Sequence, residues 1–288
     1  AYIGMVDAHL ANNDLDAAQR AVNKLLEIAP DLPAGVGRAA LIALRKNQLP
    51  AALTLARQLQ AKPETAREGL TMEGQIEITR GNWDAAATAL RKLVDSDSST
   101  TSVLMLHTAL TRGNKLPAAK ALIDQWLKAH PQDAVALFYL GTQAEADRNP
   151  AGAEQRYREI LAFDPDHALA LNNLAMLMVQ QKRPGAIALA ERAVDRAQEK
   201  ATFLDTLAQA HAAEGQFAKA VEAQKRAVAL APAEHGWRLA LAKLQLKAGD
   251  KAGAKAELDR LAALGASFAE HGEVANLRSS LTSLAAGR

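Results

Sequence analysis

Residues 133–165 read DAVALFYLGTQAEADRNPAGAEQRYREILAFDP and predict two amphipathic helices joined by a short turn. In the first half, Gly141 lies on an apolar stripe with helical spacing. Pro150 follows a polar break and suits the first turn of a second helix, where its missing N–H is not needed. Asp164 and Pro165 then end that helix. The stretch therefore indicates a helical hairpin.

One alanine of this hairpin, Ala153, has counterparts along the whole chain at a nearly fixed interval of 33 or 34 residues. A single globular core requires no such period, whereas a stack of similar two-helix units does. The sequence therefore predicts an all-α solenoid of about eight helix-turn-helix repeats. We call the recurring positions the repeat alanines: Ala18, Ala52, Ala86, Ala119, Ala153, Ala186, Ala220 and Ala254.

The composition agrees with a helical core built from small residues. Hydrophobic residues make up 49% of the chain but aromatic residues only 4%, so alanine, leucine and valine must fill the core. The net charge of +2 argues against a general nucleic-acid binder. The absence of cysteine excludes disulfides, thiol nucleophiles and cysteine zinc sites. No apolar run reaches the ~18 residues of a membrane span.

No sequence motif indicates catalysis. The chain has no Walker-type glycine loop, GxSxG elbow, HExxH motif or EF-hand loop. Seven histidines lie far apart in the sequence, which favours packing or solvated roles over metal binding. We therefore expect a protein that is not an enzyme and that uses no cofactor or metal ion. The histidines are His9, His107, His130, His167, His211, His235 and His271.

The period stops after Gly265, and residues 266–288 predict one more amphipathic helix. A terminal repeat exposes an apolar face, which such a helix would cover. We therefore expect a repeat array in residues 1–265 and a C-terminal capping helix in residues 266–288. The apolar positions of the capping helix are Val274, Leu277, Leu281 and Leu284.

The N-terminus has a different pattern. Ala1 is not an initiator methionine, and by the register it falls inside a first helix. We expect the first repeat to be truncated at this end, in a fragment or processed product of a longer chain.

The unit resembles the tetratricopeptide repeat (TPR) over about residues 1–265. The family pattern of leucine and glycine in the first helix, an aromatic residue and alanines in the second, and a final proline is clearest in LFYLG…GAEQRYREILAFDP and FLDTLAQAHAAEGQFAKAVEAQKRAVALAP. Three features depart from this pattern. His107 replaces a small residue and Gln224 replaces an aromatic residue. The repeat of Ala186 has one residue fewer in its turn. The resemblance implies a right-handed superhelical scaffold that binds protein partners or extended peptides.

A finer resemblance rests on the stretch that begins ALALNNLAMLMVQQKRPGAIALAERAV and on the later ELDRLAALG. These look like bacterial periplasmic TPR proteins of exopolysaccharide export and of the PEP-CTERM (exosortase) sorting system. The likeness implies a scaffold in a periplasmic or envelope-associated assembly, with a cytoplasmic location as the alternative. Two other functions stay open: a groove that binds a carbohydrate polymer, and the TPR part of a larger enzyme. The sequence does not fix the oligomeric state.

In a TPR superhelix the first helices line the concave side, so the resemblance places one row of their side chains in a groove. This row lies eleven residues before each repeat alanine, or ten before Ala186. We call it the inner row: Asp7, Leu41, Gln75, Thr108, Thr142, Met176, Gln209 and Lys243.

Side chains of the inner row and beside it are the predicted partner-binding residues. Their amides and hydroxyls could pair with the backbone of an extended peptide, although the same residues also suit a plain solvated surface. Phe138, Tyr139 and Trp237 lie near this face and are the aromatic candidates for contacts. The predicted partner-binding set is Gln75, Thr108, Thr111, Arg112, Phe138, Thr142, Asn172, Asp205, Gln209, Lys243 and Lys247.

Overall fold

The computed structural model describes residues 1–197, 200–265 and 268–286, with side chains up to residue 281. Within these ranges the chain forms seventeen helices and no strand, which confirms the all-α prediction. Sixteen of the helices form eight successive pairs. The first helices of the pairs are α1 (Tyr2–Ala11), α3 (Pro33–Arg45), α5 (Ala66–Thr79), α7 (Thr100–Arg112), α9 (Ala134–Ala146), α11 (Ala168–Gln180), α13 (Ala201–Ala213) and α15 (His235–Lys247). The second helices are α2 (Leu15–Ile28), α4 (Leu49–Gln60), α6 (Trp83–Ser96), α8 (Leu116–Ala129), α10 (Pro150–Phe163), α12 (Ala186–Ala197), α14 (Phe217–Leu230) and α16 (Lys251–Ala262).

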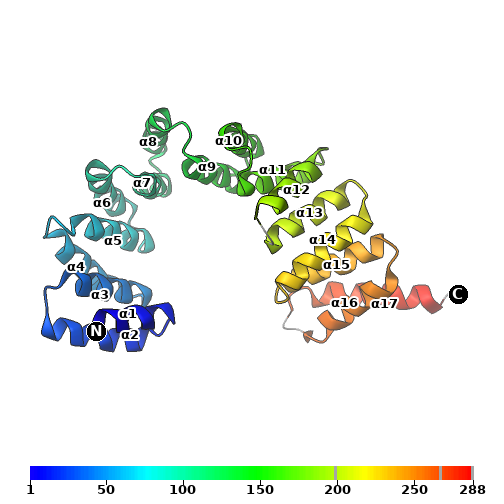
Figure 1. Ribbon diagram of the computed structural model, residues 1–288, viewed down its shortest axis with the longest axis horizontal. Coiled ribbons are helices and arrows are strands. Elements are labelled where there is room, and N and C mark those ends of the chain that lie inside the picture. The colour runs from blue at the N-terminus through cyan, green and yellow to red at the C-terminus, as the bar shows by residue number, and fades with distance from the viewer. Residues whose placement is uncertain (198–199, 266–267, 287–288) are drawn as a thin grey trace. The chain divides into compact units, whose positions relative to one another are not determined.

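The helices form two compact units, Ala1–Ala136 and Leu137–Arg288. Within each unit, helices that are neighbours in sequence pack against one another, as Figure 1 shows. Within a unit, the second helix of a pair also packs against the first helix of the next pair, as α4 does with α5 and α14 with α15. Each unit is therefore a stack of helical hairpins.

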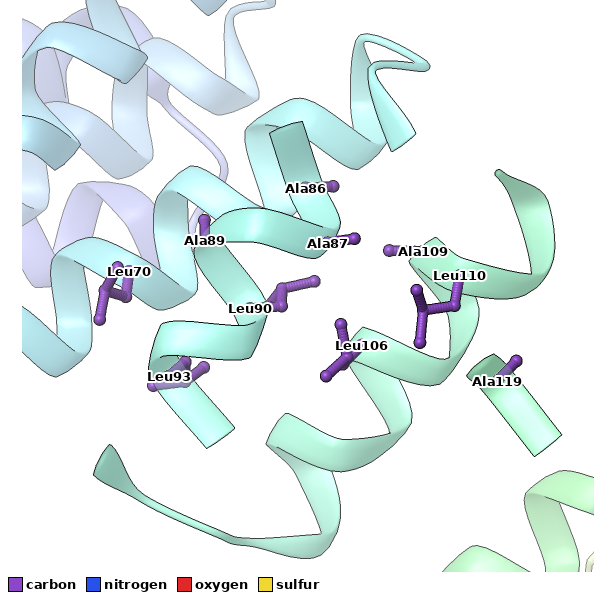
Figure 2. Close-up of a cluster of buried hydrophobic side chains, with 10 residues drawn as sticks. All are labelled: Leu70, Ala86, Ala87, Ala89, Leu90, Leu93, Leu106, Ala109, Leu110 and Ala119. Carbon is purple, nitrogen blue, oxygen red and sulfur yellow. The ribbon is translucent and has the colours of Figure 1, made fainter. Parts of the chain in front are cut away.

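All eight repeat alanines are buried, with at most 2% of each residue exposed. Figure 2 shows one such region of the core, where Ala86 and Leu90 of α6 belong to a cluster with Leu106, Ala109 and Leu110 of α7. The methyl side chain of each repeat alanine lets neighbouring helices approach closely, and a larger side chain at that position would overpack the core. The predicted register of the repeats is confirmed.

A second position, one residue before the inner row, is buried in all eight repeats. It is glycine in two of them. A Cβ atom on Gly141 would lie 2.5 Å from Cε1 of Tyr157, and one on Gly74 would lie 2.4 Å from Cδ2 of Leu90. Here the absence of a side chain makes room for a large residue on the paired helix. The two contacts explain the glycine of the family pattern by packing.

The turns that join the paired helices share one backbone conformation. Each contains a residue with φ between 54° and 83°. In the fifth repeat this residue is Arg148: its N–H donates to the carbonyl oxygen of Glu145 at 3.0 Å, and the N–H of Asn149 donates to that of Ala144 at 2.8 Å. These two hydrogen bonds are a Schellman motif, which ends a helix. The residues with positive φ are Asn13, Asn47, Gly81, Asn114, Arg148, Lys182, Gly215 and Gly249.

The sixth repeat is one residue shorter than its neighbours, and the shortening lies in this turn. Lys182 lies four residues before Ala186, whereas its counterparts lie five residues before their repeat alanines. Gly185 adds a second positive φ of 92°, which a residue with a Cβ atom adopts only with strain. As a result α12 begins at Ala186 itself, whereas the other repeat alanines are the fourth residue of their helices.

The last helix, α17 (His271–Ala286), packs against α16. Its Val274 is 1% exposed and shares a hydrophobic cluster with Leu258 and Leu261 of α16, together with Leu277 and Leu281. Lys243 of α15 also forms an ion pair with Glu273 at 2.7 Å. The helix covers the apolar side of the eighth pair, as expected for a cap. The side chain of Leu284 lies outside the described residues.

Replacing Arg148 with glycine should stabilise the protein. Arginine at a positive φ costs roughly 1–2 kcal/mol, and the greater freedom of glycine in the unfolded chain cancels part of the gain, so we expect about 0.5–1 kcal/mol. Thermal unfolding followed by circular dichroism measures the change. Arg226→Gly, in the middle of α14, is the matched control and should lose about 1 kcal/mol. Destabilisation by Arg148→Gly would contradict this account of the turn.

His107 should make the protein less stable in acid. It occupies the buried small-residue position of the fourth repeat and is 8% exposed, and burial lowers the pKa of its imidazole. Below about pH 6.5 this imidazole binds a proton more readily in the unfolded chain than in the folded chain, so the free energy of unfolding falls as the pH drops. His107→Gln should reduce the loss in urea midpoint between about pH 7 and about pH 5. His130→Gln is the matched change at an exposed histidine, and an equal reduction there would refute the assignment.

Candidate functional site

The eleven predicted partner-binding residues lie on six first helices, and none of them is buried. Gln75, Arg112, Gln209 and Lys247 are exposed, and the other seven are half-buried. They belong to two separate sets. The first compact unit holds Gln75, Thr108, Thr111 and Arg112, and the second holds Phe138, Thr142, Asn172, Asp205, Gln209, Lys243 and Lys247.

Two hydroxyl groups of this face already donate to their own helices. Thr108 Oγ1 donates to the carbonyl oxygen of Leu104 at 2.8 Å, and Thr142 Oγ1 donates to that of Tyr139 at 2.8 Å. The oxygen of the Thr142 hydroxyl keeps its capacity to accept a hydrogen bond, so this threonine offers an acceptor to a partner.

Phe138 packs within its own unit. Its ring centroid lies 5.7 Å from that of Tyr157 and 6.2 Å from that of His167. These contacts connect α9 with α10 and with the N-cap residue of α11. The ring is half-buried, so part of its area is used to hold neighbouring repeats together.

A chain of hydrogen bonds links α9, α10 and α11 next to Phe138. Tyr157, which is 0% exposed, donates to Oε2 of Glu145 at 2.9 Å and accepts from Nδ2 of Asn173 at 3.2 Å. Asn172 Nδ2 donates to Oδ1 of Asn173 at 3.2 Å. Burial, reinforced by the carboxylate of Glu145, raises the pKa of the Tyr157 hydroxyl, so it stays protonated and donates. We call these four residues the tyrosine junction.

A similar arrangement links α13, α14 and α15. The buried Gln224 occupies the position of Tyr157 two repeats later, and its Nε2 donates to Oδ1 of Asp205 at 2.9 Å and to the carbonyl oxygen of Trp237 at 3.3 Å. Gln209 Nε2 also donates to Oδ2 of Asp205, at 2.7 Å. We call Asp205, Gln209 and Gln224 the glutamine junction. In both junctions a buried polar side chain of a second helix holds a carboxylate of the first helix.

The two lysines at the C-terminal end of this face have partners inside the chain. Lys243 forms the ion pair with Glu273 described above, and Nζ of Lys247 lies 5.7 Å from the centroid of the Phe217 ring. Part of the positive charge of the last repeat is therefore balanced by the capping helix.

Reasoning from the repeat pattern did not reveal a cavity of about 550 Å³ in the first unit. It lies between α6, α7 and α8, over a floor formed by Leu106 and Leu110. The only sequence signal was the run of small residues on α8, which the helix propensity of alanine explains equally well. Ala118, Ala121 and Leu122 line the α8 side, and Val94 lines the α6 side.

Two other classes of site receive no support from the described part of the chain. Among those residues, no group of three or more histidine, aspartate or glutamate side chains is arranged to hold a metal ion. None of the helices described there has the length and apolar character needed to cross a membrane.

Comparison with known proteins places this architecture among TPR proteins. The sequence profile of the tetratricopeptide repeat matches residues 104–168 and 176–235. The solved structure of a tetratricopeptide repeat protein from Parabacteroides merdae is similar, with a TM-score of 0.53 and 16% identity, over 68% of this chain and 78% of that one. The structure of pilF from Pseudomonas aeruginosa has a TM-score of 0.56 and 19% identity, over 73% of this chain and 96% of that one. These likenesses concern the fold.

A curated relative is more similar in sequence. "Cellulose synthase operon protein C" from Xanthomonas axonopodis pv. citri (strain 306) is 28% identical over 264 residues, which is 88% of this chain. The chain spans only 16% of the length of that relative. These matches identify tetratricopeptide repeats in residues 104–168 and 176–235, and the eight hairpins of the described chain have the fold of such repeats.

Proposed function

We propose that the chain is a non-catalytic scaffold that binds protein partners or extended peptide segments through the side chains of its first helices. One observation carries the proposal. In every repeat the residue of the inner row is exposed or half-buried, while the residue just before it is buried. The core uses one side of each first helix and leaves the opposite side to solvent, where a partner could bind. No nucleic-acid partner is proposed, because the net charge is only +2.

The setting we propose is an envelope assembly for exopolysaccharide in a bacterium. The relative from Xanthomonas axonopodis supports it, because its name connects it with a cellulose synthase operon. The earlier resemblance to TPR proteins of exopolysaccharide export points the same way. The PEP-CTERM part of that resemblance stays a prediction, as does the periplasmic location.

The name of the same relative also favours a second candidate, direct binding of a carbohydrate polymer. Carbohydrate sites commonly stack sugar rings on exposed aromatic side chains. Phe138 uses part of its ring against Tyr157 and His167, and Trp237 is half-buried against the cluster of Val221, Val228 and Leu241. Of the two candidates, the peptide-binding scaffold therefore agrees better with the structure.

Bulky, uncharged side chains in the inner row should block peptide binding. Peptides are first selected from a random display library on the unmodified protein, and their affinity is measured by fluorescence anisotropy. The double variant Thr142→Tyr and Gln209→Tyr should weaken binding at least about tenfold, or about 1.4 kcal/mol. Circular dichroism should show unchanged helicity, because both sites face solvent.

The matched control places the same bulk on second helices, as Ala188→Tyr and Glu222→Tyr, and should bind the peptides normally. Equal affinity in both double variants would exclude the inner row as the binding surface. Failure to select any peptide, together with measurable binding of cellohexaose, would favour the carbohydrate candidate.

A further inference from the structure

Three neighbouring first helices of the second unit lack lysine and arginine. The sequences of α9, α11 and α13 contain neither lysine nor arginine, and their only acidic residues are Glu145 and Asp205. Both carboxylates are half-buried and belong to the two junctions. The helices are close neighbours, since the tyrosine junction links α9 to α11 and α11 packs against α13. Among lysine, arginine, aspartate and glutamate, these three helices therefore carry only the two acidic side chains.

Within the described residues, both carboxylates receive hydrogen bonds from neutral donors alone. Glu145 accepts from the Tyr157 hydroxyl, and Asp205 accepts from the amides of Gln209 and Gln224. Nearby arginines of the fifth and sixth repeats are occupied elsewhere: Arg156 pairs with Glu159, and Arg183 pairs with Glu154. In the part of the chain that the structure describes, neither junction therefore contains an internal cation that bonds to its carboxylate.

Each junction also contains a surplus acceptor. Asn172 Oδ1 and Gln224 Oε1 are buried, and neither has a hydrogen-bond donor within reach in the described chain. Gln224 itself is 0% exposed, so water does not reach its side chain freely. A buried oxygen without a donor costs free energy, and each junction thus combines a carboxylate with an unsatisfied amide oxygen. Both are rich in acceptors and short of donors.

We propose that the solvent side of α9, α11 and α13 recognises an extended peptide segment that carries lysine or arginine side chains, with Glu145 and Asp205 as the anchoring carboxylates. The inference rests on the proposed function and adds the chemistry of the partner. Ammonium and guanidinium groups supply several donors without any acceptor, which complements the half-buried carboxylates of both junctions. Partial burial of the carboxylates strengthens the attraction relative to a fully solvated ion pair. Lys243 and Lys247 lie on α15, the next first helix along the chain.

The test uses a short fluorescein-labelled peptide in which lysine alternates with serine, and a control peptide with glutamine in place of lysine. The lysine peptide should bind the complete chain measurably better than the glutamine peptide, and added salt should weaken it. Glu145→Gln and Asp205→Asn keep the shape of each side chain and remove its charge. Each should weaken binding of the lysine peptide roughly fivefold, with little effect on the glutamine peptide.

Glu191→Gln is the matched control, because it removes an exposed carboxylate from the second helix α12. It should leave the affinity of the lysine peptide unchanged. Equal affinity for both peptides, or an equal loss in all three variants, would overturn the proposal. If peptides selected from the library still require Thr142 and Gln209, the scaffold function survives without this specificity. If no peptide uses the inner row, both proposals fail.

Discussion

The close crossing of helices at the repeat alanines is the constraint on which the architecture depends. Each of these residues is at most 2% exposed, so the site tolerates little more than a methyl group. Once this contact is fixed, helical periodicity determines which residues face the paired helix and which face solvent. The buried position before the inner row and the solvent-facing inner row itself both follow from it. A surface for partners is thus a consequence of how the core is packed.

Near this contact, a small residue on one helix of a repeat is matched by a large residue on the other helix. Where the first helix has Gly141 or Gly74, the second has the large Tyr157 or Leu90. Because Tyr157 and Gln224 take the same place in their repeats, one core position can accept a polar side chain if neighbouring helices supply hydrogen-bond partners. The polar side chain at this core position in turn holds a half-buried carboxylate of the first helix, Glu145 in one repeat and Asp205 in the other.

The spacing of the alanines, the turns and the capping helix was predictable from sequence, because each depends on residue type at a fixed interval. Asparagine and glycine adopt positive φ readily, whereas arginine and lysine do not, so only their place in the register assigns Arg148 and Lys182 this conformation. The bond between Asn173 and Tyr157 was beyond prediction, because it depends on side-chain rotamers across two helices. The cavity beside α8 likewise results from many packing distances together.

The contacts of this fold are local in sequence, as each helix packs mainly against the next one or two. Hydrophobic clusters follow the same rule. The cluster around Val6 and Ile42 consists of residues near the N-terminal end of the array, and the cluster around Leu258 and Val274 consists of residues near its C-terminal end. A chain organised in this way closes only short loops as it folds, which favours fast folding. It also lacks a single all-or-none nucleus, so a pulling force or a mild denaturant would peel hairpins from one end while those further along stay folded.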